Sequence, residues 1–389
     1  MWLPAMTLVA ASCVTVAVVA VDDSARAVVK TSVPGVWLAN DAAASVSHVG
    51  QDGVDATVPL DRQTGALRVI QVDGTAYVTD DSGRVSRIDP AQLAVAQEAM
   101  LPSSGSRLVA GGGRLYAVDT TSGTVRQLDP VQLTSIGQAV TVARPLGAAV
   151  VDPSGVLWVN DIGAGDIVAV DGRTVGTRAK VTDPDVPVQL SVVGAAVVVV
   201  DARKATVTVV KNRQPSAPRP LTTEPGATIE VPDAVPGGVV LPLTSGNRSL
   251  VLIDVDTGRV RTVDLGVEGH KLGAPRVSSA KAYVPDYTAG SVLVVDLATA
   301  QLTRTVAVTG KAGTFDLVTD DTSVYVNDPG SERAWTLNDA GEAVPASKYD
   351  PKSPRDGGRG VQVVPPAPTV PPPGAPGAAV VGVVLGDSP

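Results

Sequence analysis

The chain has 389 residues and a formal charge of −8, because 39 Asp and Glu outnumber 31 Lys and Arg. One Cys, two His and 11 aromatic residues leave too few ligands for a zinc or haem site, no partner for a disulfide, and little choice of catalytic histidine. The lack of basic clusters also excludes nucleic acid as a partner, because binding phosphates requires grouped Lys and Arg.

The N-terminus carries an apolar segment, Leu3–Val21, of 19 uncharged residues. Its length is close to that of a membrane-spanning helix, and Ala25-Arg26-Ala27 matches a signal-peptidase pattern. We favour a retained anchor over residues 1–27, with a cleaved signal peptide as the first alternative and a buried structural segment as the second. Cys13 is interpreted as a small residue within this helix rather than as a lipidation site. The anchor and the signal both place the rest of the chain outside the cytoplasm.

A repeat of about 41 residues organises residues 28–346. Its marker is a short β-forming run that usually closes on Asp or Asn: Val36–Asn40, Ala76–Asp80, Leu115–Asp119, Leu157–Asp161, Val197–Asp201, Val240–Thr244, Ala282–Asp286 and Val324–Asp328. A turn cluster and a second run follow each marker, as in a β-hairpin, and two further short strands complete each unit. Four strands in 40–45 residues are typical of a β-propeller blade. We therefore predict an all-β propeller of eight four-stranded blades, the first starting at Val28, with seven blades as the alternative.

Six aromatic residues occupy one equivalent position in successive repeats: Trp37, Tyr77, Tyr116, Trp158, Tyr283 and Tyr325. Ligand-binding aromatics would not keep such a register, so we predict that this position packs between neighbouring blades. Tyr287, Phe315, Trp335 and Tyr349 remain as candidates for other roles.

The motifs that carry chemistry are weak, and we predict no catalytic, cofactor-binding or metal-binding residues and no cofactor. The strand-end Asp residues fit turn stabilisation better than a cation site, and Asp254–Gly258 fits a hairpin turn better than a calcium loop. His48 and His270 lack a nucleophile motif and are predicted to be surface or rim residues. Gly111–Gly113 is interpreted as a turn between blades. Paired carboxylates for glycoside hydrolysis stay open, because only their spacing in the folded protein matters.

The repeat pattern ends after residue 346, and we predict that residues 347–389 form a Pro-rich linker. Lys348, Lys352, Arg355 and Arg359 give its start a positive charge, and seven prolines between 365 and 376 predict a stiff, extended chain. Ala378–Leu385 is too short to span a bilayer and is interpreted as a disordered end or as the first strand of a missing domain. We expect such a domain to have followed in a longer gene.

The runs Ala76–Asp80, Leu157–Asp161 and Val324–Asp328 resemble the YVTN-type repeats of extracellular propellers. The wider layout is similar to that of actinobacterial membrane-anchored surface proteins, in which a propeller precedes fibronectin type III or other immunoglobulin-like domains. The chain departs from that layout because it ends before any complete domain of this kind. The resemblance implies a cell-surface location and no particular chemistry.

The sequence thus predicts a non-enzymatic, monomeric extracellular module. It would be held in the cell membrane by a single N-terminal helix, or secreted if that segment is cleaved, and would present its propeller to a protein or glycan partner of the envelope. The alternative is an enzyme acting on an envelope polysaccharide, or the accessory subunit of one, that uses carboxylates of the central funnel. A purely structural spacer is a third interpretation.

Overall fold

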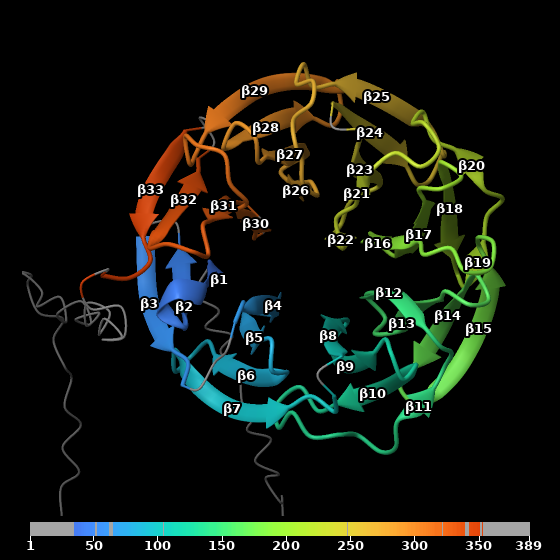
Figure 1. The fold of residues 1–389 in the computed structure, drawn as a ribbon, viewed down its shortest axis with the longest axis horizontal. Coiled ribbons are helices and arrows are strands. Elements are labelled where there is room, and N and C mark those ends of the chain that lie inside the picture. The colour runs from blue at the N-terminus through green and yellow to red at the C-terminus, as the bar shows by residue number, and fades with distance from the viewer. Residues whose placement is uncertain are drawn as a thin grey trace, which may run out of the picture. The chain divides into compact units, whose positions relative to one another are not determined.

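The protein forms an eight-bladed β-propeller, as predicted, and the alternative of seven blades is wrong (Figure 1). The computed structural model describes residues 35–50, 53–61, 65–103, 105–246, 248–320, 322–338, 342–350 and 352. The predicted anchor at 1–27 with Cys13, and the tail from residue 353, lie outside the described residues. No helix within the described ranges is long and apolar enough to cross a membrane.

Each blade is one antiparallel sheet whose first strand lies nearest the centre of the ring (Figure 1). Blade 1 shows three strands within the described residues, β1 (Val36–Asn40), β2 (Ser45–Gly50) and β3 (Gly53–Pro59), with a short 3₁₀ turn, η1 (Asp41–Ala43), after β1. Its predicted start at Val28 lies outside the described residues. Blade 2 contains β4 (Arg68–Val72), β5 (Thr75–Thr79), β6 (Arg84–Asp89) and β7 (Ala94–Met100). Blade 3 contains β8 (Ser106–Gly111), β9 (Arg114–Asp119), β10 (Thr124–Leu128) and β11 (Val140–Thr141). Blade 4 contains β12 (Leu146–Val151), β13 (Leu157–Asp161), β14 (Asp166–Asp171) and β15 (Thr174–Lys180).

The second half of the ring follows the same plan, with one departure. Blade 5 contains β16 (Gln189–Val193), β17 (Ala196–Asp201), β18 (Thr206–Lys211), β19 (Gln214–Pro215) and β20 (Arg219–Pro220), and β22 (Ala234–Val235) joins its inner edge in parallel. Blade 6 contains β21 (Ile229–Glu230), β23 (Val240–Ser245), β24 (Ser249–Asp254) and β25 (Val260–Asp264). Blade 7 contains β26 (Arg276–Ser278), β27 (Lys281–Asp286), β28 (Ser291–Asp296) and β29 (Gln301–Ala307). Blade 8 contains β30 (Asp316–Thr319), β31 (Val324–Asn327), β32 (Arg333–Leu337) and β33 (Ala343–Ser347).

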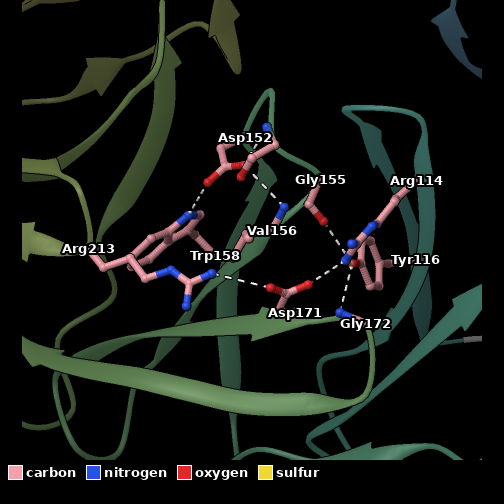
Figure 2. Close-up of polar contacts among 10 residues, drawn as sticks. Arg114, Tyr116, Asp152, Gly155, Val156, Trp158, Asp171, Gly172 and Arg213 are labelled. Carbon is pink, nitrogen blue, oxygen red and sulfur yellow. Dashed lines mark hydrogen bonds and ion pairs between the residues drawn. The ribbon is translucent and has the colours of Figure 1, made fainter.

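The repeated aromatic position packs between adjacent blades, as predicted. Tyr116 and Trp158 are almost fully buried, in clusters that each join a blade to the next one. The Tyr116 hydroxyl donates to the Gly155 carbonyl of blade 4 (2.8 Å) and accepts from the Gly172 amide (3.3 Å). The Trp158 indole donates to Asp152 (2.9 Å), so each ring also fixes a turn through its polar atom (Figure 2).

The same region carries a chain of charges across three blades. Asp171 of blade 4 accepts from Arg114 of blade 3 (2.7 Å) and from Arg213 of blade 5 (3.3 Å), as Figure 2 shows. These side chains are partly exposed, so they orient neighbouring blades while contributing little net stability.

The strand-end aspartates stabilise turns, as predicted. In Asp80, Asp119 and Asp254, one carboxylate oxygen accepts two backbone N–H groups from the turn that follows. These bonds hold the pKa of Asp119 and of Asp254 below the ordinary value of 3.8. Within the described ranges, no group of three or more His, Cys, Asp or Glu could hold a metal ion.

The Gly111–Gly113 prediction needs one correction, because these residues form the turn from β8 to β9 within blade 3 rather than a turn between blades. Gly112 has a φ of 53°, and a Cβ there would lie 2.4 Å from the Gly155 nitrogen of blade 4. Only glycine therefore allows the two blades to approach this closely.

The ring is closed by contacts between blades 8 and 1 that include Lys348, which was predicted to belong to the start of the linker. Its side chain is fully buried, and Nζ donates to Asn327 Oδ1 (2.6 Å) and to the Ala39 and Asp328 carbonyls (3.1 and 2.8 Å). Ser47 of blade 1 donates to the Lys348 carbonyl (2.9 Å). Propeller contacts thus continue two residues past the predicted boundary at 346.

Candidate functional site

A cavity of about 1040 Å³ occupies the middle of the ring, walled mainly by inner strands of blades 1, 2, 7 and 8 and by β22. Its polar lining residues are Arg68, Gln71, Asp73, Asp233, Arg276, Asp316, Thr319, Asp320, Thr322 and Asn327. Apolar groups from Leu38, Leu67, Val69, Leu317 and Val318 alternate with them. A concave surface of this size with mixed lining is typical of a ligand site.

Inner-strand side chains link one blade to the next across this cavity wall. Arg276 Nε of blade 7 donates to the Leu317 carbonyl of blade 8 (3.2 Å). Gln71 binds blade 1 twice, by donating to the Gly35 carbonyl (3.1 Å) and by accepting from the Trp37 amide (3.0 Å). These bonds satisfy backbone groups at the inner edges and fix the positions of the polar side chains.

Asp316, at the first residue of β30, is the most perturbed carboxylate of the cavity. Part of the Asp316 side chain is accessible to solvent, but protein atoms surround the carboxyl on most sides. The resulting desolvation raises the pKa of the carboxyl above 3.8. A hydrogen bond from Asn327 (3.3 Å) and the charges of Lys348 and Arg276 oppose the shift without cancelling it. Asp316 is therefore held in position, and its other oxygen has no recorded partner among the described residues.

Two of the unassigned aromatics come together beside this carboxylate. Tyr287 and Phe315 pack edge to face, with ring centroids 5.3 Å apart, and the Lys271 ammonium lies 5.9 Å from the Tyr287 ring centroid. Burial raises the pKa of Tyr287, and the negative charges of Asp316 and Glu230 raise it further. A Cβ at position 273 would lie 2.4 Å from the Tyr287 hydroxyl, so glycine there makes room for the ring.

We call Arg276, Tyr287, Phe315, Asp316 and Asn327 the channel site. It combines a cation, a carboxyl, an amide and a phenol on three strands and two loops of blades 7 and 8. The terminal nitrogens of Arg276 have no recorded partner within the described ranges. Arg276, Asp316 and Asn327 line the cavity, whereas Tyr287 and Phe315 pack behind them and Phe315 is only 2% exposed. The site can thus donate and accept hydrogen bonds at the cavity wall.

The two histidines lie in different places, and one prediction about them is wrong. His48 is 3% exposed rather than on the surface, because its ring packs edge-on against Trp37 (5.0 Å) and Nδ1 lies 2.7 Å from Asp55. His270 lies at the rim, half-buried, with Nδ1 2.8 Å from the buried Asp286 carboxylate.

The His270–Asp286 pair belongs to a repeated arrangement. Ser103 and Thr182 occupy the same loop before their blades and likewise donate to the marker aspartates Asp119 and Asp201. His270 therefore fixes its loop as these hydroxyls do. This repeated hydrogen bond could not be predicted from the sequence because the residue type differs between blades.

The remaining two aromatics are not part of the channel site. Trp335 is 8% exposed, packs in the core between blades 7 and 8, and has the Arg333 guanidinium 5.6 Å from its ring centroid. Tyr349 is half-buried just after the last strand. Of the four unassigned aromatics, Tyr287 and Phe315 therefore lie beside the Asp316 carboxylate, and none of the four lines the cavity.

No protein-family model matches the chain, and no curated protein matches it. Similar solved structures include the dihydro-heme d1 dehydrogenase NirN (15% identity, TM-score 0.60, covering 80% of this chain and 73% of that one). AztD from Citrobacter koseri is 18% identical, with a TM-score of 0.58 and coverage of 80% and 94%. BamB from Moraxella catarrhalis is 15% identical, with a TM-score of 0.55 and coverage of 77% and 89%. At these identities the similarity establishes the propeller fold alone.

Proposed function

We propose that the protein is a non-enzymatic binding module of the cell envelope whose channel site binds a glycan. The observation that carries this proposal is the channel site itself. It offers fixed donors and acceptors among apolar side chains in the wall of a cavity of about 1040 Å³. A sugar presents both hydroxyl groups and apolar C–H faces, which such a mixed lining can contact.

Most polar and aromatic groups elsewhere have structural partners, and this supports binding over catalysis. The marker aspartates hold turns, the repeated aromatics pack between blades, and both histidines pair with aspartates. Asp316 and Arg276 keep unused hydrogen-bonding capacity at the cavity surface. The NirN structure, solved in complex with DHE, illustrates that a propeller of similar fold can hold a ligand.

The test is direct binding of envelope glycan fragments to the purified protein, measured by calorimetry. Asp316→Asn and Arg276→Gln should each weaken binding about tenfold, the effect of losing one charge-assisted hydrogen bond. Arg304→Gln, on the exposed outer strand β29, is the matched control and should bind like the wild type. Failure of every glycan to bind, or full binding by both channel-site variants, would contradict the proposal.

A second candidate is an enzyme acting on an envelope polysaccharide, or its accessory subunit, and the raised pKa of Asp316 favours it. A carboxyl that stays protonated more readily is suited to general-acid catalysis of glycoside hydrolysis. Incubating the glycans with the protein and assaying new reducing ends separates the two candidates. Turnover by the wild type that disappears in Asp316→Asn would favour the enzyme.

The location is part of the same proposal: residues 1–27 would anchor a monomeric propeller outside the cell. Protease added to intact cells should then degrade the propeller, while fractionation should leave the uncut protein with the membranes. Recovery of the whole protein in the culture medium would indicate a cleaved signal instead.

A further inference from the structure

One connection breaks the repeat, and it builds a second cavity. The link from the first to the second strand of a blade is two residues long in blades 2, 3, 5 and 7, but it is nine residues long, 231–239, in blade 6. Part of this insertion forms β22, which pairs with β16 through the Val192 amide and the Asp233 carbonyl (2.9 Å). The insertion is therefore an ordered wall rather than a loose loop.

The insertion encloses a pocket of about 500 Å³ together with the corresponding turns of blades 7 and 8. Its apolar wall comes from Val235, Val239, Val240, Val277, Leu297 and Ala298. We call this cavity the insertion pocket. Arg276 and Asp316 stand at the first residues of β26 and β30, whereas the insertion pocket lies at the last residues of these strands. The pocket and the central cavity share the lining residues Pro236, Thr319 and Asp320. Its size is within the range of small-molecule sites.

The polar groups of the insertion pocket do not favour a charged ligand. Asp320 is its one ionisable lining residue, and its carboxylate already accepts from the Thr322 amide (2.9 Å), the Ser323 amide (2.6 Å) and the Tyr325 hydroxyl (3.2 Å). The Ser278 hydroxyl is buried in the wall and has no hydrogen-bond partner among the described residues. A buried hydroxyl without a hydrogen-bond partner is unfavourable, and a ligand, or a water molecule bound together with a ligand, can supply the missing hydrogen bond.

The backbone at the pocket edge is strained. Ser279 and Ala280 form the two-residue turn between β26 and β27, with φ values of 49° and 59°. The equivalent turn of blade 3, Gly112-Gly113, uses glycine at both positions for this left-handed conformation, and that of blade 2, Asp73-Gly74, uses it at one.

We propose that the insertion pocket binds a neutral, mostly apolar small molecule with one hydrogen-bonding group. This site is distinct from the proposed glycan site, because it lies at the other end of the inner strands and would bind a ligand of a different chemical class. Val239, half-exposed at the mouth of the pocket, controls entry.

The probe for the test is N-phenyl-1-naphthylamine, a neutral apolar amine whose fluorescence rises on binding, titrated into the full-length protein. One saturable site is expected. Val239→Trp, which fills the mouth, and Val239→Asp, which adds a charge, should each weaken binding at least tenfold. Val344→Trp and Val344→Asp are matched controls, because Val344 has the same 50% exposure on β33, and they should bind like the wild type.

Two further variants separate this site from the channel site. Asp316→Asn should leave probe affinity unchanged even if it abolishes glycan binding. Ser278→Ala should weaken probe binding several-fold, because the amine of the probe loses its partner. Absence of saturable binding to the wild type, equal binding by the Val239 and Val344 variants, or loss of probe binding in Asp316→Asn would each overturn the proposal.

Discussion

Replacing Lys348 with methionine removes a buried ammonium group from the junction that closes the ring. Methionine fills a similar volume without a donor, so Asn327 Oδ1 and the Asp328 carbonyl lose their Nζ partner. The Asp328 carbonyl keeps a second donor in the Ser331 amide (3.1 Å), and the Ala39 carbonyl keeps one in the Asn327 side-chain amide (3.2 Å). Asn327 Oδ1 is then the one buried acceptor of Nζ left without a donor among the described residues, and such a loss costs roughly 1–3 kcal/mol of unfolding free energy. The variant should therefore lose roughly 1–3 kcal/mol when the lysine it replaces is neutral.

The size of this loss should depend on pH, because burial lowers the pKa of Lys348 from 10.5 to about 8. The folded pKa is below the unfolded one, so between pH 8 and pH 10.5 the unfolded chain binds more protons than the folded chain. The stability contributed by Lys348 therefore rises with pH in this window. A shift of this size corresponds to about 3 kcal/mol, of which about 2–3 kcal/mol falls between pH 7 and pH 10.

The measurement is urea unfolding of the wild type and Lys348→Met at pH 7, 8, 9 and 10, followed by circular dichroism. The tyrosines titrate in both proteins and cancel in the difference between them. The penalty of the variant should grow by about 2–3 kcal/mol from pH 7 to pH 10, whereas Lys352→Met, an exposed neighbour, should show no such growth. A penalty that stays constant or shrinks with pH would refute a desolvated ammonium at the blade junction.

Three other substitutions test separate parts of the fold, each by urea unfolding. Tyr116→Phe leaves the Gly155 carbonyl without its donor and should cost about 1–3 kcal/mol, while Tyr349→Phe should cost little. Asp316→Asn should raise the urea midpoint at pH 7, because the pKa of the Asp316 carboxyl is raised in the folded chain and its ionisation therefore destabilises that chain. The gain should disappear on acidification through pH 4, and a gain that persists in acid would contradict this. Ala300→Gly should stabilise by about 1 kcal/mol, since alanine at a φ of 58° is strained; unchanged stability would show that this turn is relaxed.

The blade pattern could be predicted from the sequence because its determinants are local. A β-forming run that ends in a turn-stabilising Asp recurs at intervals of 39 to 43 residues, and the predicted Leu157–Asp161 coincides with β13. The aromatic register was predicted for the same reason, since one position per repeat meets the same neighbouring blade, as Tyr116 and Trp158 show.

The ring closure and the channel site could not be predicted, because they join residues that are distant in sequence. Lys348 and Ala39 are 309 positions apart, and nothing near Lys348 distinguishes it from the lysine at 352. Arg276 and Asp316 are 40 positions apart and face the same cavity only once the blades are arranged radially. His48 was placed on the surface because the sequence does not reveal the Trp37 ring that covers it.

The departures from the repeat identify where specificity arises. Eight equal blades would make a symmetric channel, and a symmetric lining cannot distinguish one orientation of a ligand from another. The asymmetric groups lie mainly in blades 6 to 8: the nine-residue insertion, His270 in place of a hydroxyl, the Ser279-Ala280 turn, and the Asp316 carboxyl with its aromatic neighbours. Each of these features differs from the residue or the loop length that the other blades have at the same position. Such departures from the local sequence pattern are expected at functional sites. Ligand recognition should therefore tolerate changes at equivalent positions of blades 3 and 4, such as Arg107, far better than changes in blades 6 to 8.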